Sequence, residues 1–261
     1  MPTPSDWDPA LYLRHADERS RPMADLVARV PTRARSVLDL GCGPGHLTAL
    51  LRSRWPAAEV VGVDASPAMV ERARAQAADP GVRYVLGDVR TYEPERTVDV
   101  VVSNATLQWV PGHLDLLPRL AGLVAPGGTL AFSVPGNHDA PSHRLLREVA
   151  GRGPYAAHAS GVARPRAHDP EVYLDALGAP GWDVDAWETT YLHVLHGPDP
   201  VLGWISSTGA RPVLAALPDD LRARFEAEYG AALRAAYPPR PRDGATVLPF
   251  RRVFVVASRT A

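Results

Sequence analysis

The sequence of 261 residues contains no lysine, so all 28 of its basic residues are arginine. The absence of lysine excludes Schiff-base catalysis and the phosphate-binding lysine of a P-loop. The one cysteine, Cys42, excludes an internal disulfide and a cysteine-rich metal centre. A formal net charge of -1 argues against a broad nucleic-acid surface and against a polybasic membrane surface.

Long hydrophobic runs are also missing. The apolar stretches at 55–64 and 98–110 are shorter than the roughly 20 residues that a membrane-spanning helix needs. The segment from Met1 to Pro9 is polar and acidic rather than basic and then apolar, as a signal peptide would be. We therefore expect a globular, cytoplasmic protein with no membrane partner, long enough for one large domain.

Short β-branched runs alternate with helical patterns between Ser36 and Val134. Ser66 is typical of a helix N-cap, and Pro67 of a first helical position. Continuous apolar strands that alternate with helices predict a parallel sheet covered on both faces. The five expected strands are Val37–Leu40, Val60–Asp64, Val82–Leu86, Val98–Ser103 and Thr129–Val134.

The C-terminal half predicts two further strands, at 184–194 and 246–257. The patterns indicate helices at 142–149, at 170–177 and throughout 200–237, and one or two helices at 8–30. The fold class is therefore α/β, a doubly wound, mostly parallel sheet of seven strands with a helical cap. We expect a single domain over 1–261, with an N-terminal helical lid (1–35), a βα core (36–135) and an acceptor side (136–261).

A glycine-rich loop leaves the first predicted strand, with Asp39 before it and Gly41, Gly43 and Gly45 within it. Glycine lets the backbone turn sharply and approach a ligand closely. A dinucleotide fingerprint needs a third glycine three positions after Gly43, where this chain has His46. The pattern therefore disfavours a nicotinamide-dependent dehydrogenase.

The loop resembles motif I of the class I S-adenosylmethionine (SAM)-dependent methyltransferases. Asp64 ends the second strand, where an acid can accept the ribose hydroxyls, and the resemblance places Asp88 against the adenine amino group. Asn104 resembles motif IV, which lies beside the transferring methyl group. The resemblance implies SAM as cofactor, S-adenosylhomocysteine as product, no metal, and cofactor contacts from Tyr12, Asp39, Gly41, Gly43, Asp64, Ala65, Asp88, Val89 and Asn104.

Over nearly its whole length the chain is similar to the trans-aconitate 2-methyltransferases. Its His46 and His138 differ from the asparagine and the aromatic residue expected there. Short segments in the expected order carry the resemblance: 7–9, 12–14, 17–19, 103–110, 135–137, 139–143, 187–191 and 249–252.

The resemblance implies methyl transfer from SAM to one carboxylate of a small polycarboxylic acid, giving a monomethyl ester. A carboxylate is ionised at neutral pH and is already the nucleophile, so we expect alignment rather than a catalytic acid or base. Bidentate arginine suits the remaining carboxylates. The acceptor-binding candidates are Arg252, Arg251, Tyr191, His143 and Asn137.

Two other activities stay open at this point. A C- or N-methyltransferase of another metabolite would need a proton acceptor, which His138, His143 or Tyr191 could provide. A SAM-binding protein without catalysis would agree with the two departures from the family pattern. In either case we expect a small-molecule partner, no nucleic acid, and a monomer or homodimer.

Overall fold

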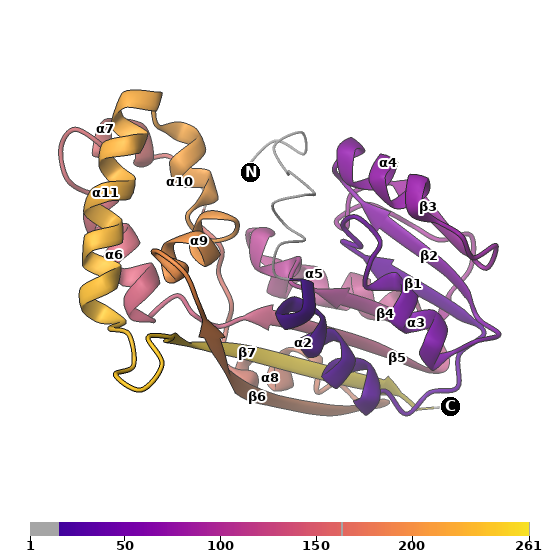
Figure 1. Cartoon of the computed structure of the whole chain (residues 1–261). Helices are drawn as coiled ribbons and strands as arrows, with labels where there is room; N and C mark the ends of the chain where they lie inside the picture. Colours follow the sequence, from indigo (N-terminus) through magenta and orange to yellow (C-terminus); the bar gives the residue numbers. More distant parts are fainter. Residues whose placement is uncertain (1–15, 163, 261) are drawn as a thin grey trace. The chain divides into compact units, whose positions relative to one another are not determined.

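A computed structural model describes residues 16–162 and 164–260 (Figure 1). The strands of this part of the chain are β1 (Ser36–Leu40), β2 (Glu59–Asp64), β3 (Val82–Leu86), β4 (Val98–Asn104), β5 (Val124–Pro135), β6 (Trp182–Leu195) and β7 (Thr246–Arg259). Its helices are α2 (Ala16–Arg29), α3 (Thr48–Arg54), α4 (Pro67–Gln76), η2 (Leu107–Trp109, a 3-10 turn), α5 (His113–Gly122), α6 (Pro141–Ala150), α7 (Ala156–Ala159), α8 (Pro170–Leu177), α9 (Pro200–Ser206), α10 (Arg211–Ala216) and α11 (Asp219–Ala236).

The seven strands form one sheet in the order β3-β2-β1-β4-β5-β7-β6. The pairs β2–β3, β1–β2, β1–β4 and β4–β5 are parallel, whereas β7 runs antiparallel to β5. In β4, Val100, Val101 and Val102 are all buried, as expected for a strand covered on both faces. The doubly wound α/β fold is confirmed.

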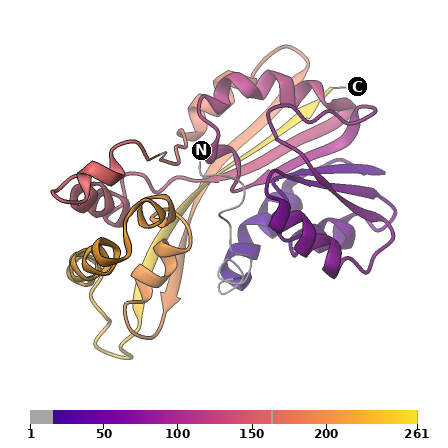
Figure 2. The same ribbon diagram turned by 90° about the horizontal axis from the view of Figure 1, so that it is seen from above.

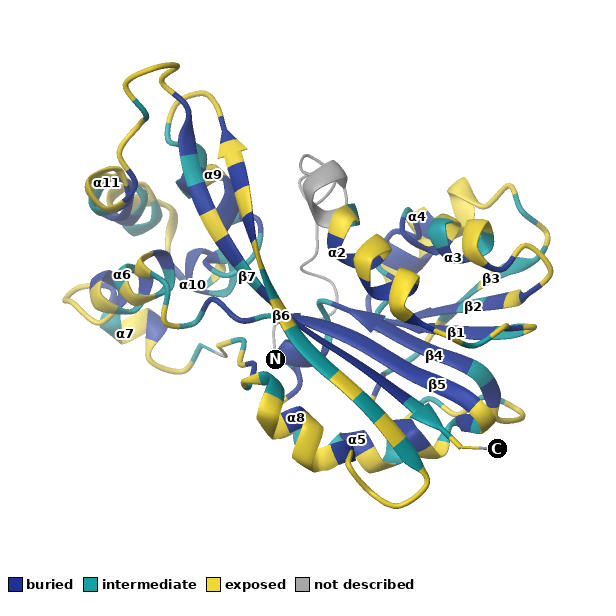
Figure 3. Cartoon of the chain, turned by 90° about the horizontal axis from the view of Figure 1, so that it is seen from below, coloured by how far each residue is buried: buried dark blue, intermediate teal, exposed yellow. Residues whose placement is uncertain are grey.

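Helices cover both faces of this sheet. Helices α2, α3 and α4 lie on one face and α5 and α8 on the other (Figures 1 and 3), and the view from above shows the same two layers (Figure 2). The side chains between the layers form a core that includes Leu38, Val101 and Phe132. Helix α4 begins as its sequence indicated, because Ser66 accepts a hydrogen bond from the Met69 N–H and Pro67 occupies the first turn.

Strand β5 and helix α5 are among the elements that differ from those expected. Strand β5 begins at Val124 rather than Thr129, with a register irregularity near its start, where Gly127 adopts a left-handed φ of 73°. Helix α5 was not singled out from the sequence. Its buried Leu117, Leu120 and Ala121 follow the i, i+3, i+4 spacing that would have indicated it.

The helical region expected at 200–237 is divided into α9, α10 and α11. Helix α10 ends at Ala216, and Pro218 follows its C-cap residue Leu217, where a proline disfavours continuation of the helix because it has no N–H to donate. In α11, the buried Phe225, Tyr229 and Leu233 recur every four residues and form its inward face.

The chain divides into two compact units. Of the described residues, the sheet unit contains 16–135, 167–189 and 252–260, and the helical unit contains 136–162, 164–166 and 190–251. The helical unit has its own core, with Tyr155, Trp204 and Phe225 fully or almost fully buried. The expected division into lid, core and acceptor side stays a prediction. None of the helices described has the length and apolarity needed to cross a membrane.

Candidate functional site

The glycine loop follows β1 at the carboxyl edge of the parallel strands. The register pairs Leu40 with Val63 and Asp64 with Leu86, so the ends of β1, β2 and β3 lie at the same edge. The Gly41 N–H donates to the Val63 carbonyl oxygen over 2.7 Å, which fixes the loop to β2. In open α/β sheets, ligands bind at this edge.

Gly41 and Gly43 are needed for different reasons, although both have left-handed φ values, of 81° and 57°. A Cβ on Gly41 would lie 1.9 Å from the Thr106 hydroxyl oxygen, so close packing excludes any side chain there. A Cβ on Gly43 would meet nothing within 4 Å. Gly41 therefore allows the loop to pack, whereas Gly43 leaves open space beside the backbone.

Asp64, expected to accept the ribose hydroxyls, links the loop to α4. One carboxylate oxygen accepts the Gly43 N–H over 2.9 Å and the other accepts the Ser66 N–H over 2.8 Å. Burial raises the pKa of Asp64 above its ordinary value, while hydrogen bonds from the backbone of Ser66, Gly43 and Ala65 partly oppose the shift. Ala65 itself is exposed beside this carboxylate.

Asp39 lies within the sheet, only 2% exposed. Its carboxylate accepts a hydrogen bond from the fully buried Thr48 hydroxyl over 3.1 Å. Burial is the main cause that raises the pKa of Asp39 to about 7, and the negative charge of Asp64 adds to it. Burial, and after it the charges of Asp39 and Asp64, raises the pKa of the Cys42 thiol, which therefore stays protonated and packs as an apolar group.

Asp88 and Val89 follow β3. The Asp88 carboxylate is ion-paired with Arg90 and also accepts the Arg90 N–H over 2.8 Å, and these bonds lower the pKa of Asp88. Val89 belongs to the apolar core, so only its backbone is available for polar recognition. The carboxylate remains ionised and fixed in direction at the sheet edge.

Asn104 ends β4 and is 8% exposed. Its side-chain oxygen accepts a hydrogen bond from the Ser133 hydroxyl over 2.6 Å. The next residue, Ala105, adopts a left-handed φ of 57°, a conformation that residues with a Cβ rarely adopt.

The residues at this edge fit SAM. Two carboxylates with raised pKa values, the buried Asp39 and the half-buried Asp64, lie near a backbone turn that is open at Gly43. A cationic ligand would stabilise the ionised form of both carboxylates, whereas these negative charges would repel the pyrophosphate of a dinucleotide. The charge of the edge therefore suits a sulfonium nucleoside.

Arg252 lies in β7 opposite Pro135, the last residue of β5, so the antiparallel strand brings it to the carboxyl end of β5. It is 5% exposed, whereas the neighbouring Arg251 is half-buried. The side-chain oxygen of Asn137 accepts the Arg251 N–H over 2.7 Å, and its nitrogen donates to the Arg251 carbonyl over 3.0 Å. Asn137 therefore holds the backbone of β7.

Both Tyr191 and His143 belong to the helical unit, where Tyr191 is buried and His143 is half-buried. The ring of Tyr191 stacks on His193 with 6.3 Å between the centroids. The Ser142 hydroxyl lies 3.2 Å from Nδ1 of His143, and a Cβ on Gly209 would lie 2.7 Å from its Nε2. Burial, followed by the positive charge of Arg147, lowers the pKa of His143 to about 4. Tyr12 lies outside the described residues.

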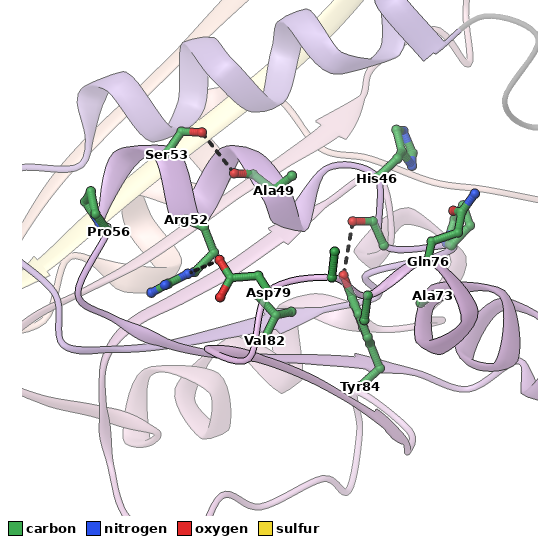
Figure 4. A pocket seen from close by; sticks show the side chains of 14 residues that line it. His46, Ala49, Arg52, Ser53, Pro56, Ala73, Gln76, Asp79, Val82 and Tyr84 are labelled. Carbon is green, nitrogen blue, oxygen red and sulfur yellow. Dashed lines mark hydrogen bonds and ion pairs between the residues drawn. The ribbon is translucent and has the colours of Figure 1, made fainter.

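Three residues that sequence reasoning missed support the loop. Thr48 and Thr106 contact Asp39 and Gly41 as described, and the Tyr84 hydroxyl donates to the Gly45 carbonyl over 3.2 Å. Tyr84 also lines a cavity of about 610 Å³ behind the loop, together with His46 and the ion-paired Arg52 (Figure 4). None of the three was recognised from the sequence, because none is an acid or a glycine at the end of a strand. Their role becomes visible only from their contacts in the folded chain.

Comparison with known proteins gives close relatives. Residues 37–128 match the methyltransferase domain family. The trans-aconitate 2-methyltransferase of Streptomyces avermitilis is 51% identical, with 98% of this chain and 97% of that protein covered. The protein of the same name from Methylobacterium radiotolerans is 48% identical, with 98% of this chain and 100% of that protein covered.

Solved structures with the same fold are more distant. A phosphoethanolamine N-methyltransferase 2 of Haemonchus contortus has a TM-score of 0.57 at 17% identity, over 92% of this chain and 53% of that one. The plantazolicin methyltransferase BpumL, in complex with S-adenosylhomocysteine, has a TM-score of 0.51 at 11% identity, over 100% of this chain and 86% of that one. By its near-full-length identity to curated relatives, the chain belongs to the trans-aconitate 2-methyltransferase family, whose methyl donor is SAM.

Proposed function

We propose that the protein transfers a methyl group from SAM to one carboxylate of trans-aconitate, giving the monomethyl ester and S-adenosylhomocysteine. The observation that carries this proposal is the 51% identity, over 98% of the chain, to a protein of that name. The expected cytoplasmic location, the absence of a nucleic-acid partner and the monomeric or homodimeric state belong to the same proposal.

The cofactor side of the proposal rests on the carboxyl edge of the sheet. SAM supplies, when bound, a methyl group on a sulfonium sulfur. Gly41 and Gly43 shape the loop, Asp39 and Asp64 provide negative charge, and Asp64 also has lone pairs for the ribose hydroxyls. Asp88, Asn104 and the backbone beside Ala65 and Val89 complete the proposed set, with Tyr12 as its candidate from the N-terminal segment.

The acceptor side rests on arginine. The chain has no lysine, and a guanidinium can bind a carboxylate with two parallel hydrogen bonds, which aligns it as well as attracting it. We assign this role first to Arg252 because it is buried at the end of β5, and then to Arg251, Tyr191 and His143. Asn137 contributes through the backbone of Arg251.

Of the three candidates for a general base, His143 is poorly suited to accept a proton. A base works best when its pKa is close to the working pH, and the pKa of His143 is lowered to about 4. This imidazole is neutral at pH 7 but a weak proton acceptor. Its N–H can still donate a hydrogen bond to a carboxylate of the acceptor, which is consistent with ester formation.

The direct test incubates the purified protein with methyl-labelled SAM and trans-aconitate. We expect a labelled product that releases methanol in mild base, since an ester hydrolyses there and a C- or N-methyl group does not. Absence of any base-labile product across related di- and tricarboxylates would exclude the proposal. Tight SAM binding without turnover would instead favour a non-catalytic role.

Replacement of Arg252 tests the acceptor assignment. Arg252→Gln should raise the KM for trans-aconitate about tenfold or more, since charge-assisted bonds contribute about 1.5–3 kcal/mol each, while the Kd for SAM changes little. Arg72→Gln, which alters an exposed arginine on α4, is the matched control and should leave both constants unchanged. Wild-type kinetics for Arg252→Gln would remove this arginine from the acceptor site.

A further inference from the structure

The turn that follows β4, from Asn104 to Gln108, holds an unfavourable backbone conformation. Ala105 has a φ of 57°, and among the described residues only Asp199 shares a positive φ without being glycine. Such a conformation persists only where surrounding contacts hold it, and it often occurs at functional sites. The turn also contains Asn104, which the resemblance places beside the transferring methyl group.

Both peptide groups of Ala105 are held by neighbours. Its N–H donates to the Ser133 carbonyl on β5 over 2.8 Å. Its carbonyl oxygen accepts a hydrogen bond from the side-chain nitrogen of Gln108 over 2.6 Å, and Gln108 is 6% exposed. Because these partners are buried on a strand and on η2, the left-handed turn is fixed rather than mobile.

The side-chain direction of Asn104 is fixed by the same strand. The Ser133 hydroxyl, 1% exposed, donates to the side-chain oxygen of Asn104 over 2.6 Å. An amide has an acceptor at one end and a donor at the other. A bond at the oxygen end therefore leaves the NH₂ end of Asn104 for another partner, and that end can donate to a carboxylate or carboxyl oxygen.

Thr106 joins this turn to the glycine loop. Its side chain packs directly on Gly41, where a Cβ would lie 1.9 Å from the hydroxyl oxygen. The hydroxyl also faces the carbonyl oxygens of Gly41 and Asn104, each at 3.4 Å. A displacement of the turn would therefore displace the loop, and the two behave as one packed element.

We propose that Ser133, Thr106 and Gln108 are positioning residues for methyl transfer, which act through Asn104. Together they hold the strained Ala105 turn and aim the NH₂ of Asn104 at a fixed place relative to the glycine loop. The proposal rests on the proposed methyltransferase function and adds the origin of the alignment. Alignment is the main task of this chain, because the acceptor needs no activation.

The first test relieves the strain. Ala105→Gly removes the Cβ that disfavours a left-handed φ, so the protein should be as stable as wild type or more stable in urea. The turn loses its stiffness, however, and kcat should fall about tenfold or more, with the Kd for SAM within about twofold. A variant that is equally stable and retains wild-type kcat would overturn the role of the turn.

The second test removes one hydroxyl and has a matched control. Ser133→Ala deletes the bond to Asn104, whereas Ser103→Ala deletes an equally buried hydroxyl on β4 that donates to the Leu40 carbonyl over 2.7 Å. We expect a similar loss of stability in both variants but a lower kcat only in Ser133→Ala. Equal kcat values in the two variants would overturn the proposal.

A readout without acceptor separates this proposal from the methyltransferase assignment. In NMR spectra of the protein with S-adenosylhomocysteine, the side-chain NH₂ signals of Asn104 should shift or broaden in Ser133→Ala and stay unchanged in Ser103→Ala. If wild type fails to methylate trans-aconitate but the signals respond in this way, the acceptor is wrong and the positioning stands. If the signals do not respond, the positioning fails whatever the acceptor.

Discussion

The carboxyl edge of the sheet unit and the core of the helical unit use their buried polar groups in opposite ways. In the helical unit, the Tyr229 hydroxyl donates to the Ser142 carbonyl over 2.9 Å, and the Tyr237 hydroxyl accepts the Ser142 N–H over 3.0 Å. These neutral groups satisfy the start of α6. At the sheet edge, Asp39 and Asp64 are carboxylates whose pKa values are raised because burial disfavours their charge.

This difference distinguishes polar groups that stabilise the fold from polar groups that are suited to bind a ligand. A buried polar group with complete partners stabilises the protein modestly. A buried charge with incomplete compensation destabilises it, and such groups concentrate at functional sites. Replacing a carboxylate of the sheet edge should therefore reduce ligand affinity, and removing a hydrogen-bonded hydroxyl of the helical core should reduce stability.

The largest expected effect comes from Gly41→Ala. Its Cβ would overlap the Thr106 side chain and its φ is left-handed, so the free energy of unfolding should fall by about 2–5 kcal/mol. Gly43→Ala is the control in the same loop, with no atom near its Cβ, and should cost about 1–2 kcal/mol while it weakens SAM binding. Urea unfolding and calorimetry measure both quantities. Similar losses of stability in the two variants would contradict the distinction between Gly41, which is closely packed, and Gly43, which lies beside open space.

Asp64→Asn should weaken SAM binding by about 1–3 kcal/mol, because it removes the negative charge and one acceptor from the edge. Asp79→Asn is the control, since the Asp79 side-chain oxygens accept the Gly81 N–H and an Arg52 N–H without belonging to the proposed cofactor set. Calorimetric titration with SAM compares the two. An affinity loss as large in Asp79→Asn would mean that the effect is structural.

The affinity for SAM should rise with pH, by about tenfold from pH 6 to pH 8. The folded pKa of Asp39 is about 7 and the unfolded value is near 4, so the folded state keeps a proton that the unfolded state loses between these values. Stability contributed by Asp39 therefore decreases from pH 4 to pH 7. A cationic ligand favours the ionised carboxylate, so binding at pH 6 should release protons.

Several neighbouring groups influence the titration of Asp39. Thr48 donates to it, Asp64 raises its pKa, and the Cys42 thiol and Tyr84 hydroxyl stay protonated because their pKa values are raised. Asp39→Asn should abolish most of the pH dependence and of the proton release. Both would persist in this variant if Asp64 were the titrating group.

The smallest effect is expected in the helical unit. Tyr229→Phe removes the hydrogen bond to the Ser142 carbonyl and should lower the free energy of unfolding by about 1 kcal/mol, with no change in SAM affinity. Tyr84→Phe makes the same change in the sheet unit, where the hydroxyl donates to Gly45 of the loop, and should also alter SAM affinity. Equal effects on SAM affinity in the two variants would contradict the claim that only the sheet unit uses these groups for ligand binding.

The sequence alone determined the order of the seven strands along the chain and the edge that holds the strand-end acids. Periodicity placed β1 to β4, and the Ser66–Pro67 pair placed the start of α4, because these signals depend on neighbours within a few residues. The glycine loop and Asp64 were identified from the sequence for the same reason, since each is defined by its position directly after a strand.

Only the tertiary structure decided which of these residues support others. Contacts between Thr106 and Gly41, Ser133 and Asn104, and Asn137 and Arg251 join segments that are 65, 29 and 114 residues apart in the chain. The pKa of Asp39 likewise depends on burial beneath helices that its local sequence does not specify. Short-range patterns fix local conformation, whereas packing and desolvation depend on distant segments, so the orientation and charge of the site residues follow from the fold.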